Sequence, residues 1–299
     1  MSLNVVYPRA CGVDVHKQFI VAVICISESN KPQYLRKRFS TYHNSLVQFR
    51  EWLIENDCQN VCMESTGKYY IPVYNALEGF ISNVVVANPK WVRAVKNEKD
   101  DNKDAKWIAD LFKLGIVRGS FIPPKNFRVL RELSRYLVKL TQIRAAEKNR
   151  FRNALTVGNC KADLVFRDIF GKSATNVIEY ILTEETFTDE GILERVDGRC
   201  KSTDEDILSA FSGIDFSLEQ KGRMSLIKEN INNLTEEINK LWNLIEGLIK
   251  PYEAYVEQLC TIPGLNRNSA ILILCEIGVD MSQFASYKRM TAWAGLTPG

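Results

Sequence analysis

Histidine is scarce in this sequence, and its cysteines are not arranged in pairs. There are only two histidines, His16 and His43, and none of the eight cysteines forms a C-x-x-C motif. Zinc sites and histidine-based catalytic triads depend on such residues, so the sequence argues against both. Most cysteines lie among apolar residues, and we therefore expect reduced core thiols in a cytoplasmic protein.

Long apolar runs are also absent. No stretch approaches the roughly 18–20 apolar residues that a membrane-spanning helix needs, and the chain starts with a strand-like run rather than a signal peptide. With 45% hydrophobic and 25% charged residues among 299, the composition is typical of a soluble globular protein long enough for two domains. We expect no membrane partner.

The net charge is only +3, but the basic residues gather in one region. Between residues 113 and 152 there are eleven Lys and Arg against two acids, so the rest of the chain is net acidic. A basic helix predicts contact with the phosphate backbone of a nucleic acid, and the alternative is a solvated helix face. The predicted nucleic-acid-binding residues here are Lys113, Arg118, Lys125, Arg128, Arg131, Arg135, Lys139, Arg144, Lys148, Arg150 and Arg152.

The N-terminal region predicts an α/β fold. Three strands in a meander are followed by alternating helices and strands, which indicates a mixed sheet covered by helices, as in an RNase H-like (RuvC-like) fold. The expected strands are two within 10–27 with a turn near 16–18, then 33–41, 60–63 and 84–87; the expected helices are 43–56, 69–77 and 101–114.

The helix expected from Asp101 onward carries Asp101 and Asp104 in its first turn. These acids are three residues apart, so both point the same way, while Trp107, Ile108 and Leu111 form the expected apolar face. An acid-rich first turn also suits the helix dipole without any further role.

Two earlier acids, Asp14 and Glu64, lie in strand-like runs, so four acids from three elements converge in the expected fold. Repulsion and desolvation make such a cluster unfavourable unless a cation compensates it. Oxygen ligands without His or Cys favour Mg²⁺ or Mn²⁺, and two such ions can serve phosphodiester cleavage. The alternatives are a turn-flanking acid at Asp14 and a helix-capping acid at Glu64.

A second long pattern follows the basic region. Apolar residues recur every three or four positions from Met224 to Leu248, over more than three heptads, and Pro251 ends the pattern. This a/d pattern predicts either an intramolecular antiparallel hairpin with a helix at 126–156 or a dimer seam. The remaining alternative is a plain core helix.

Near the C-terminus, Ile262-Pro263-Gly264 leads into a helix expected from Ser269 to Ile277. A Pro-Gly turn at a helix N-terminus is similar to half of a helix-hairpin-helix, whose backbone amides hold a DNA phosphate. Arg267 lies beside this turn and completes the predicted nucleic-acid-binding set. The chain stops at Gly299, just after another turn, which we interpret as a cut rather than a natural terminus.

Five segments, in this order along the chain, resemble one known family, the insertion-sequence 110 family of transposases, which are bridge-RNA-guided recombinases. The segments are Gly12-Val13-Asp14-Val15-His16-Lys17, Met63-Glu64-Ser65-Thr66-Gly67, Asn88-Pro89, Lys99-Asp100-Asp101-Asn102-Lys103-Asp104-Ala105, and Ile262-Pro263-Gly264 through Ala292-Trp293-Ala294-Gly295-Leu296-Thr297-Pro298.

The resemblance implies three regions in this chain. They are a RuvC-like catalytic domain at 1–118, a basic helix and coiled-coil linker for dimerisation at 119–252, and the N-terminal part of a helical transposase domain at 253–299. The family's Asp-Glu-Asp-Asp tetrad falls on Asp14, Glu64, Asp101 and Asp104. Because this chain has Lys99-Asp100-Asp101 where the family has Lys-Thr-Asp, Asp100 is the alternative ligand, and the spacing to Asp104 favours Asp101.

The resemblance further implies a cytoplasmic bacterial or archaeal transposase, truncated at its C-terminus. A serine in a Ser-Gly motif beyond residue 299 would attack DNA, with Mg²⁺ (or Mn²⁺) at the tetrad and a structured guide RNA pairing with donor and target DNA. We expect a homodimer through 224–248, with a tetramer as the larger assembly. Two other functions stay open: a stand-alone RuvC-like nuclease, and a nucleic-acid-binding protein without catalysis.

Overall fold

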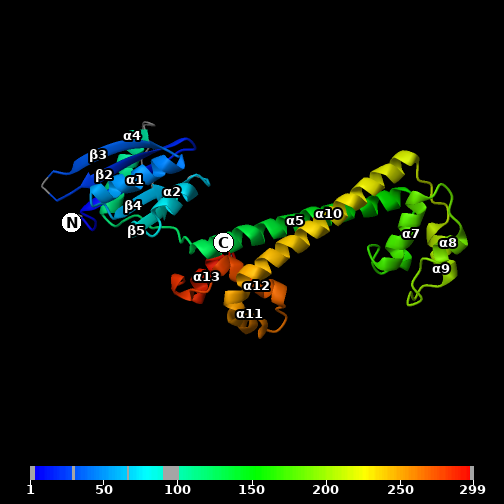
Figure 1. Cartoon of the computed structure of the whole chain (residues 1–299). Helices are drawn as coiled ribbons and strands as arrows, with labels where there is room; N and C mark the ends of the chain where they lie inside the picture. The colour runs from blue at the N-terminus through cyan, green and yellow to red at the C-terminus, as the bar shows by residue number, and fades with distance from the viewer. Residues whose placement is uncertain (1–3, 29–30, 66, 90–100, 297–299) are drawn as a thin grey trace. The chain divides into compact units, whose positions relative to one another are not determined.

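The structure, a computed structural model, describes residues 4–28, 31–65, 67–89 and 101–296, without the side chains of 101 and 102. Contacts divide the chain into two compact units, residues 1–122 and 123–299. Figure 1 gives the order of the elements along the chain. The three predicted regions, with boundaries after 118 and 252, stay a prediction.

The first unit is built on a five-stranded mixed sheet in the order β3-β2-β1-β4-β5. β1, β2 and β3 are antiparallel neighbours, whereas β4 and β5 run parallel to β1. This order and these directions are those of the RNase H-like fold, so the predicted fold class is confirmed. The strands are β1 (Arg9–Val15), β2 (Phe19–Ile26), β3 (Gln33–Ser40), β4 (Asn60–Glu64) and β5 (Asn83–Ala87).

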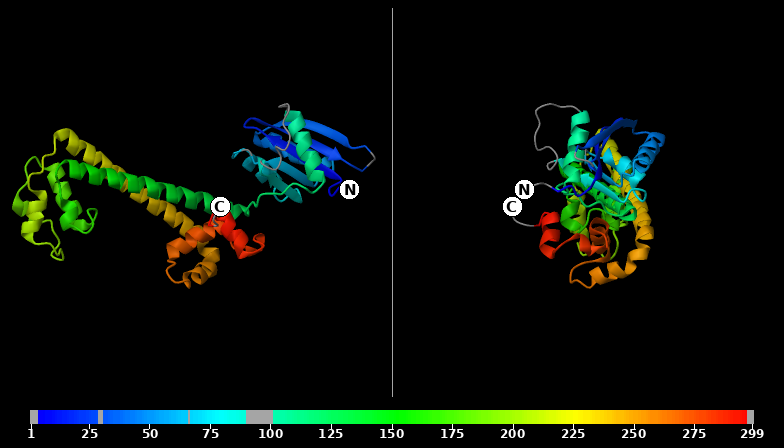
Figure 2. Two further views of the ribbon diagram at one scale, coloured as in Figure 1. Left: turned by 180° about the vertical axis from the view of Figure 1, so that it is seen from behind. Right: turned by 90° about the vertical axis from the view of Figure 1, so that its left-hand side faces the viewer.

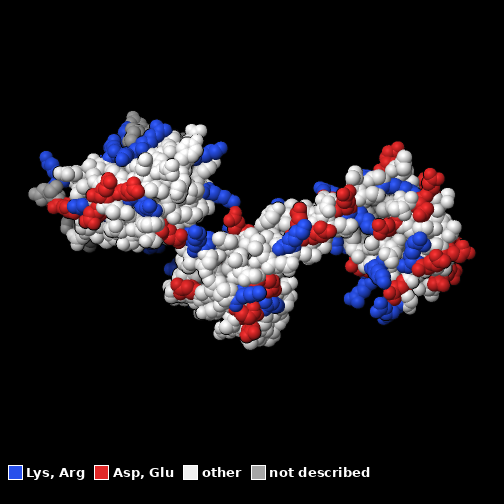
Figure 3. All heavy atoms as spheres, viewed as in Figure 1, with Lys and Arg blue, Asp and Glu red and all other residues white. Residues whose placement is uncertain are grey.

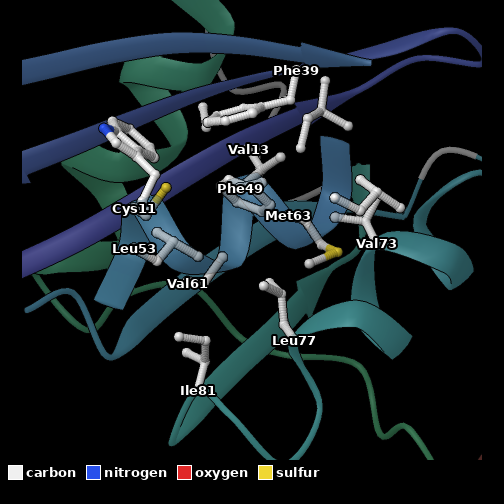
Figure 4. Packing of buried hydrophobic residues seen from close by; sticks show 14 of the residues in the cluster. Cys11, Val13, Phe39, Phe49, Leu53, Val61, Met63, Val73, Leu77 and Ile81 are labelled. Carbon is white, nitrogen blue, oxygen red and sulfur yellow. The ribbon is translucent and has the colours of Figure 1, made fainter. Parts of the chain in front are cut away.

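Helices cover both faces of this sheet. Helices α1 (His43–Glu55) and α2 (Tyr70–Leu77) pack on one face, where Phe49, Leu53 and Leu77 are fully buried (Figure 4). Helix α4 (Asp101–Lys113) crosses the opposite face, as the views from the front and from behind show (Figures 1 and 2). The sheet is therefore the middle layer of the unit, and its central strands read as continuous apolar runs because both of their faces are buried.

The buried face of α4 differs from the predicted one. Ala105, Ile108, Ala109 and Phe112 are the buried residues, whereas Trp107 is 40% exposed. The prediction for Trp107 is wrong because it rested on the helical spacing of large apolar residues, whereas this helix approaches the sheet through its small residues. The two alanines let the backbone of α4 come close to β1.

The second unit is organised around two long antiparallel helices, α5 (Lys125–Val157) and α10 (Leu218–Ile249). The a/d residues from Met224 to Leu241 and Ile245 are buried in clusters shared with α5, and Ile249 takes the last buried position while Leu248 is 40% exposed. Of the two predicted alternatives, an intramolecular hairpin and a dimer seam, the structure therefore has the intramolecular hairpin. A homodimer through 224–248 would have to compete with this pairing, and the oligomeric state stays a prediction.

Shorter helices occupy both ends of the hairpin. One end carries α6 (Ala162–Val165), α7 (Lys172–Thr183), α8 (Asp189–Leu193) and α9 (Asp204–Phe211). The other carries α11 (Glu253–Cys260), α12 (Arg267–Ile277) and α13 (Tyr287–Trp293). The first group shares one apolar cluster with α5 and α10, and α11 and α12 share another with them. No helix in the described part of the chain is long and apolar enough to cross a membrane.

Candidate active site

Asp14 is a buried carboxylate near the end of the central strand β1, with only 8% of the residue exposed. Its Oδ2 lies 3.0 Å from Nε2 of His16, which follows in the turn to β2. The His16 ring in turn stacks on Phe19, with the ring centroids 4.5 Å apart. A carboxylate buried in a central strand is costly unless it has partners, so its position favours a role in binding or catalysis.

Glu64 lies beside Asp14 on the neighbouring parallel strand. The register pairs Gly12 with Cys62 and Val13 with Met63, and one further step aligns Asp14 with Glu64 at the C-terminal end of β4. Aligned residues of parallel strands point to the same face of a sheet. Glu64 is partly buried, so two carboxylates lie at one edge of one face.

Helix α4 brings the third element to that edge. A β-carbon on Gly12 would meet the Ala105 carbonyl, so this helix covers the face to which Asp14 belongs, two residues further on. The C-terminal end of α4 lies at the start of the first unit's sheet, where Val6 and Tyr7 donate their N–H groups to the Lys113 carbonyl, at 2.8 and 3.0 Å. The first turn of α4 must therefore lie at the C-terminal ends of β1 and β4.

Asp104, in that first turn, is partly buried. Asp101 begins the helix, and its side chain, like all of Asp100, lies outside the described residues. The described His, Cys, Asp and Glu side chains hold no group of three or more that could bind one metal ion. The donor set nevertheless fits Mg²⁺ or Mn²⁺ in kind, because all four predicted ligands are carboxylates.

Many of the predicted nucleic-acid-binding residues are engaged within the second unit. Arg135 forms a bidentate pair with Glu276 at 2.8 and 2.9 Å, Arg131 donates to the Glu276 carbonyl, and Arg150 pairs with Glu147. Arg267 is held between Glu246 and Glu253, and these carboxylates raise its pKa. Arg144 bonds Thr235, Arg128 bonds the Pro123 carbonyl, and Lys148 and Arg152 lie over Phe170.

The other predicted cations divide into two groups. Lys125 and Lys139 are exposed and have no carboxylate partner among the described residues, whereas Lys113 pairs with Asp110 at 2.6 Å. Arg118 is exposed. The basic region of α5 is therefore partly neutralised by Glu276, which is distant in the sequence, and by Glu147 of the same helix.

Sequence reasoning missed two features of the first unit. One is the contact of His16 with Asp14, for which the i,i+2 spacing just beyond a strand is the signal. The other is a polar network that fastens α4 to the sheet. Asp110 accepts hydrogen bonds from Tyr34 on β3 at 2.8 Å, from Lys106 at 2.7 Å and from Lys113 at 2.6 Å.

The fold and this site together define a class of enzyme. An RNase H-like sheet with paired carboxylates at the ends of β1 and β4 is the architecture of an enzyme that acts on nucleic acid phosphodiesters. The comparisons with known proteins make the assignment more specific. The IS110-type DEDD model, described as "Transposase", matches residues 11–158, and the model described as "Transposase IS116/IS110/IS902 family" matches residues 256–299. The chain belongs to the IS110 family of transposases, and it is a DNA-recombining enzyme by that membership.

Several solved structures are similar to part of the chain. One of them is a Fowlpox virus resolvase in complex with substrate Holliday junction DNA, 18% identical, covering 35% of this chain and 72% of that chain with a TM-score of 0.24. No curated protein matches the chain.

Proposed function

We propose that this transposase is a guide-RNA-dependent, site-specific recombinase of an insertion sequence, which cuts and rejoins DNA with Mg²⁺ at Asp14, Glu64, Asp101 and Asp104. The observation that supports it most is the placement of Asp14, Glu64 and the first turn of α4 at one edge of one sheet face, in a chain of this family. These elements are distant in the sequence, and a shared site gives their acids a common purpose.

Each residue has a distinct part in this proposal. Asp14 and Glu64 are held by neighbouring strands, so their separation is fixed by the sheet rather than by a loop. Asp101 and Asp104 come from a helix whose position depends on its packing against β1. Mg²⁺ (or Mn²⁺), when bound, would neutralise the carboxylates and stabilise negative charge on the reacting phosphodiester. His16 keeps the Asp14 carboxylate oriented.

The finer parts of the proposal come from the family resemblance. We assign the nucleophile to a serine in a Ser-Gly motif C-terminal to residue 299, and not to Ser269, Ser282 or Ser286. A structured guide RNA would pair with donor and target DNA, and the working assembly would be a dimer or tetramer in the cytoplasm of a bacterium or archaeon. Lys125 and Lys139, exposed on α5, are the predicted cations best placed for phosphate contact.

The test is strand cleavage and joining on family-type donor and target DNA with the guide RNA and Mg²⁺. The 299-residue chain would be compared with a version extended to include a Ser-Gly motif. We expect strand exchange only in the extended protein, and its loss with Asp14→Asn or Glu64→Gln. Glu51→Gln is the matched control, because Glu51 is exposed on α1, across the sheet from the site.

Other outcomes of this experiment would favour one of the two alternative functions. Metal-dependent cutting by the 299-residue chain would favour a stand-alone nuclease. Binding of DNA or RNA that is unchanged in Asp14→Asn, without cutting under any condition, would favour a binding protein without catalysis. Circular dichroism of each variant would show that the fold is retained.

A further inference from the structure

The edge strand β3 presents basic residues to the same sheet face as the candidate active site. The register pairs Asp14 with Val21 and Val21 with Arg38, and it pairs Gly12 with Val23 and Val23 with Arg36. Directly opposed residues of antiparallel strands share a face. Arg36 and Arg38 therefore belong to the face that α4 covers, while Lys37 between them belongs to the face of α1.

No acid among the described residues neutralises these cations. Arg36, Lys37 and Arg38 are exposed, and none of them forms an ion pair with any residue in the described ranges. The space-filling view shows a group of Lys and Arg atoms along the rim near α4 and β3 (Figure 3). In contrast, Lys106 and Lys113 of α4 share the carboxylate of Asp110.

Charged residues on an edge strand can also be explained without any ligand. Lys and Arg protect sheet edges from pairing with other chains, and that role would apply equally to Lys37 and Arg38. A second observation distinguishes them. The Arg38 guanidinium lies 3.6 Å from the centroid of the Phe19 ring, which stacks on His16, whose Nε2 bonds Asp14.

This chain of contacts pre-positions Arg38 toward the site. A guanidinium stacked on a ring keeps its five N–H donors in the plane, available for an anion. Asp14 and Arg38 are two strands apart, which is about 10 Å at the strand spacing of ~4.8 Å. That is roughly the rise of three nucleotides of one DNA strand.

We propose that Arg36 and Arg38 form a phosphate-binding surface for DNA beside the candidate active site. They hold the backbone of the strand a few nucleotides from the phosphodiester that enters the site. This inference rests on the proposed function for the identity of the nucleic acid. Its physical basis is the juxtaposition on one sheet face of two guanidinium groups, which form no ion pair with the described residues, and the carboxylates of Asp14 and Glu64.

The test is binding of the 299-residue chain to a fluorescein-labelled 40-base-pair DNA duplex over a series of KCl concentrations. Each phosphate contact that is lost lowers the slope of log Kd against log salt by about 1. We expect Arg36→Ala/Arg38→Ala to lower the slope by about 2 and to weaken binding at low salt by about tenfold or more. Arg38→Lys, which keeps the charge, should lose less.

Lys37→Ala is the matched control for Arg38→Ala, because both remove one exposed cation from adjacent positions of one strand. Equal effects of these two variants on Kd and slope would overturn the proposal and leave protection of the sheet edge as their role. A slope change with an RNA duplex of the same sequence, and none with DNA, would also overturn it. If Arg38→Ala aggregates, the comparison of Arg38→Lys with Lys37→Arg decides in its place.

The outcome is separable from that of the proposed function. No change in slope, with cleavage still dependent on Asp14, overturns the β3 surface alone. A lowered slope, with cleavage independent of Asp14, supports the β3 surface and overturns the tetrad.

Discussion

Gly12 lies directly beneath Ala105: a β-carbon on Gly12 would come 2.2 Å from the Ala105 carbonyl oxygen and 2.4 Å from the Ala109 backbone nitrogen. Both of these atoms belong to the backbone of α4, so no side-chain rotation could relieve the overlap. The absence of a side chain at this one position of β1 sets how closely α4 approaches the sheet, and with it the place of Asp104.

Gly12→Ala should therefore lift α4 from the sheet. We expect the free energy of unfolding to fall by about 1–3 kcal/mol, the usual cost of overpacking a core, as measured by urea denaturation. Gly222→Ala is the control, since a β-carbon there would meet nothing within 4 Å; in the interior of α10 it should stabilise by about 0.5–1 kcal/mol. Equal effects at the two glycines would contradict the close contact.

The network around Asp110 predicts an acid-sensitive contribution to stability. Burial raises the pKa of Asp110, but hydrogen bonds from Lys106, Lys113 and Tyr34 lower it by more, so the net pKa lies below its ordinary value. A carboxyl with a lowered pKa stabilises the fold above its unfolded pKa, about 3.9, and loses that contribution as pH falls through its folded pKa.

Asp110→Asn should reduce stability at pH 7 by about 1–3 kcal/mol and should flatten the loss of stability on acidification below about pH 4. Urea denaturation at a series of pH values measures both effects. Glu51→Gln, at an exposed position without an ion pair among the described residues, serves as the reference. If the Asp110→Asn variant loses as much stability on acidification as the wild type, Asp110 is not the source of the acid-sensitive contribution.

The α5–α10 hairpin predicts which leucines matter in the heptad region. Leu234 is 8% exposed and packs in the cluster that contains Leu137 and Leu140, whereas Leu226 is 69% exposed. Leu234→Ala should cost about 2–4 kcal/mol, and Leu226→Ala less than about 0.5 kcal/mol, measured by chemical denaturation.

Leu234→Lys distinguishes the hairpin from a dimer seam. If Leu234 packs within one chain, its replacement lowers the Tm at every protein concentration and leaves the mass of the remaining folded species unchanged. A folded monomer with an unaltered Tm, seen by sedimentation, would instead place Leu234 between two chains.

Thiol reactivity should follow burial. Cys260 is exposed and Cys200 is intermediate, while the other six cysteines are buried and all eight are free. Burial raises the pKa of Cys58 to about 11 and that of Cys62 to about 12, and only the thiolate reacts. At pH 8, Ellman's reagent should modify Cys260 first and Cys200 more slowly. The rest should react only after unfolding.

Local patterns predicted the elements of the first unit well. The two strands expected within 10–27 are β1 and β2, and the helix expected at 43–56 is α1. Alternating apolar residues, apolar runs and turn residues involve only a few consecutive positions, so strands and helices can be predicted from them in the sequence alone. The acid-rich first turn of α4 could be predicted from the sequence for the same reason.

What the patterns could not supply are partners that are distant in the sequence. The apolar face of α4 depends on Gly12, ninety residues earlier, and no periodicity within 101–113 could show it. The charge of Arg267 suggested a free cation, yet Glu246 and Glu253 surround it in the fold. The heptad pattern of α10 predicted packing against another helix, but it could not show whether that helix belongs to the same chain.

Helix α5 has 33 residues and α10 has 32, and apolar clusters clamp the pair at both ends. At 1.5 Å per residue such a pair is about 50 Å long, close to the rise of fifteen base pairs of DNA. Because neither helix can slide past the other without breaking both clusters, the hairpin keeps helices α6–α9 at one end and helices α11 and α12 at the other end at a fixed separation.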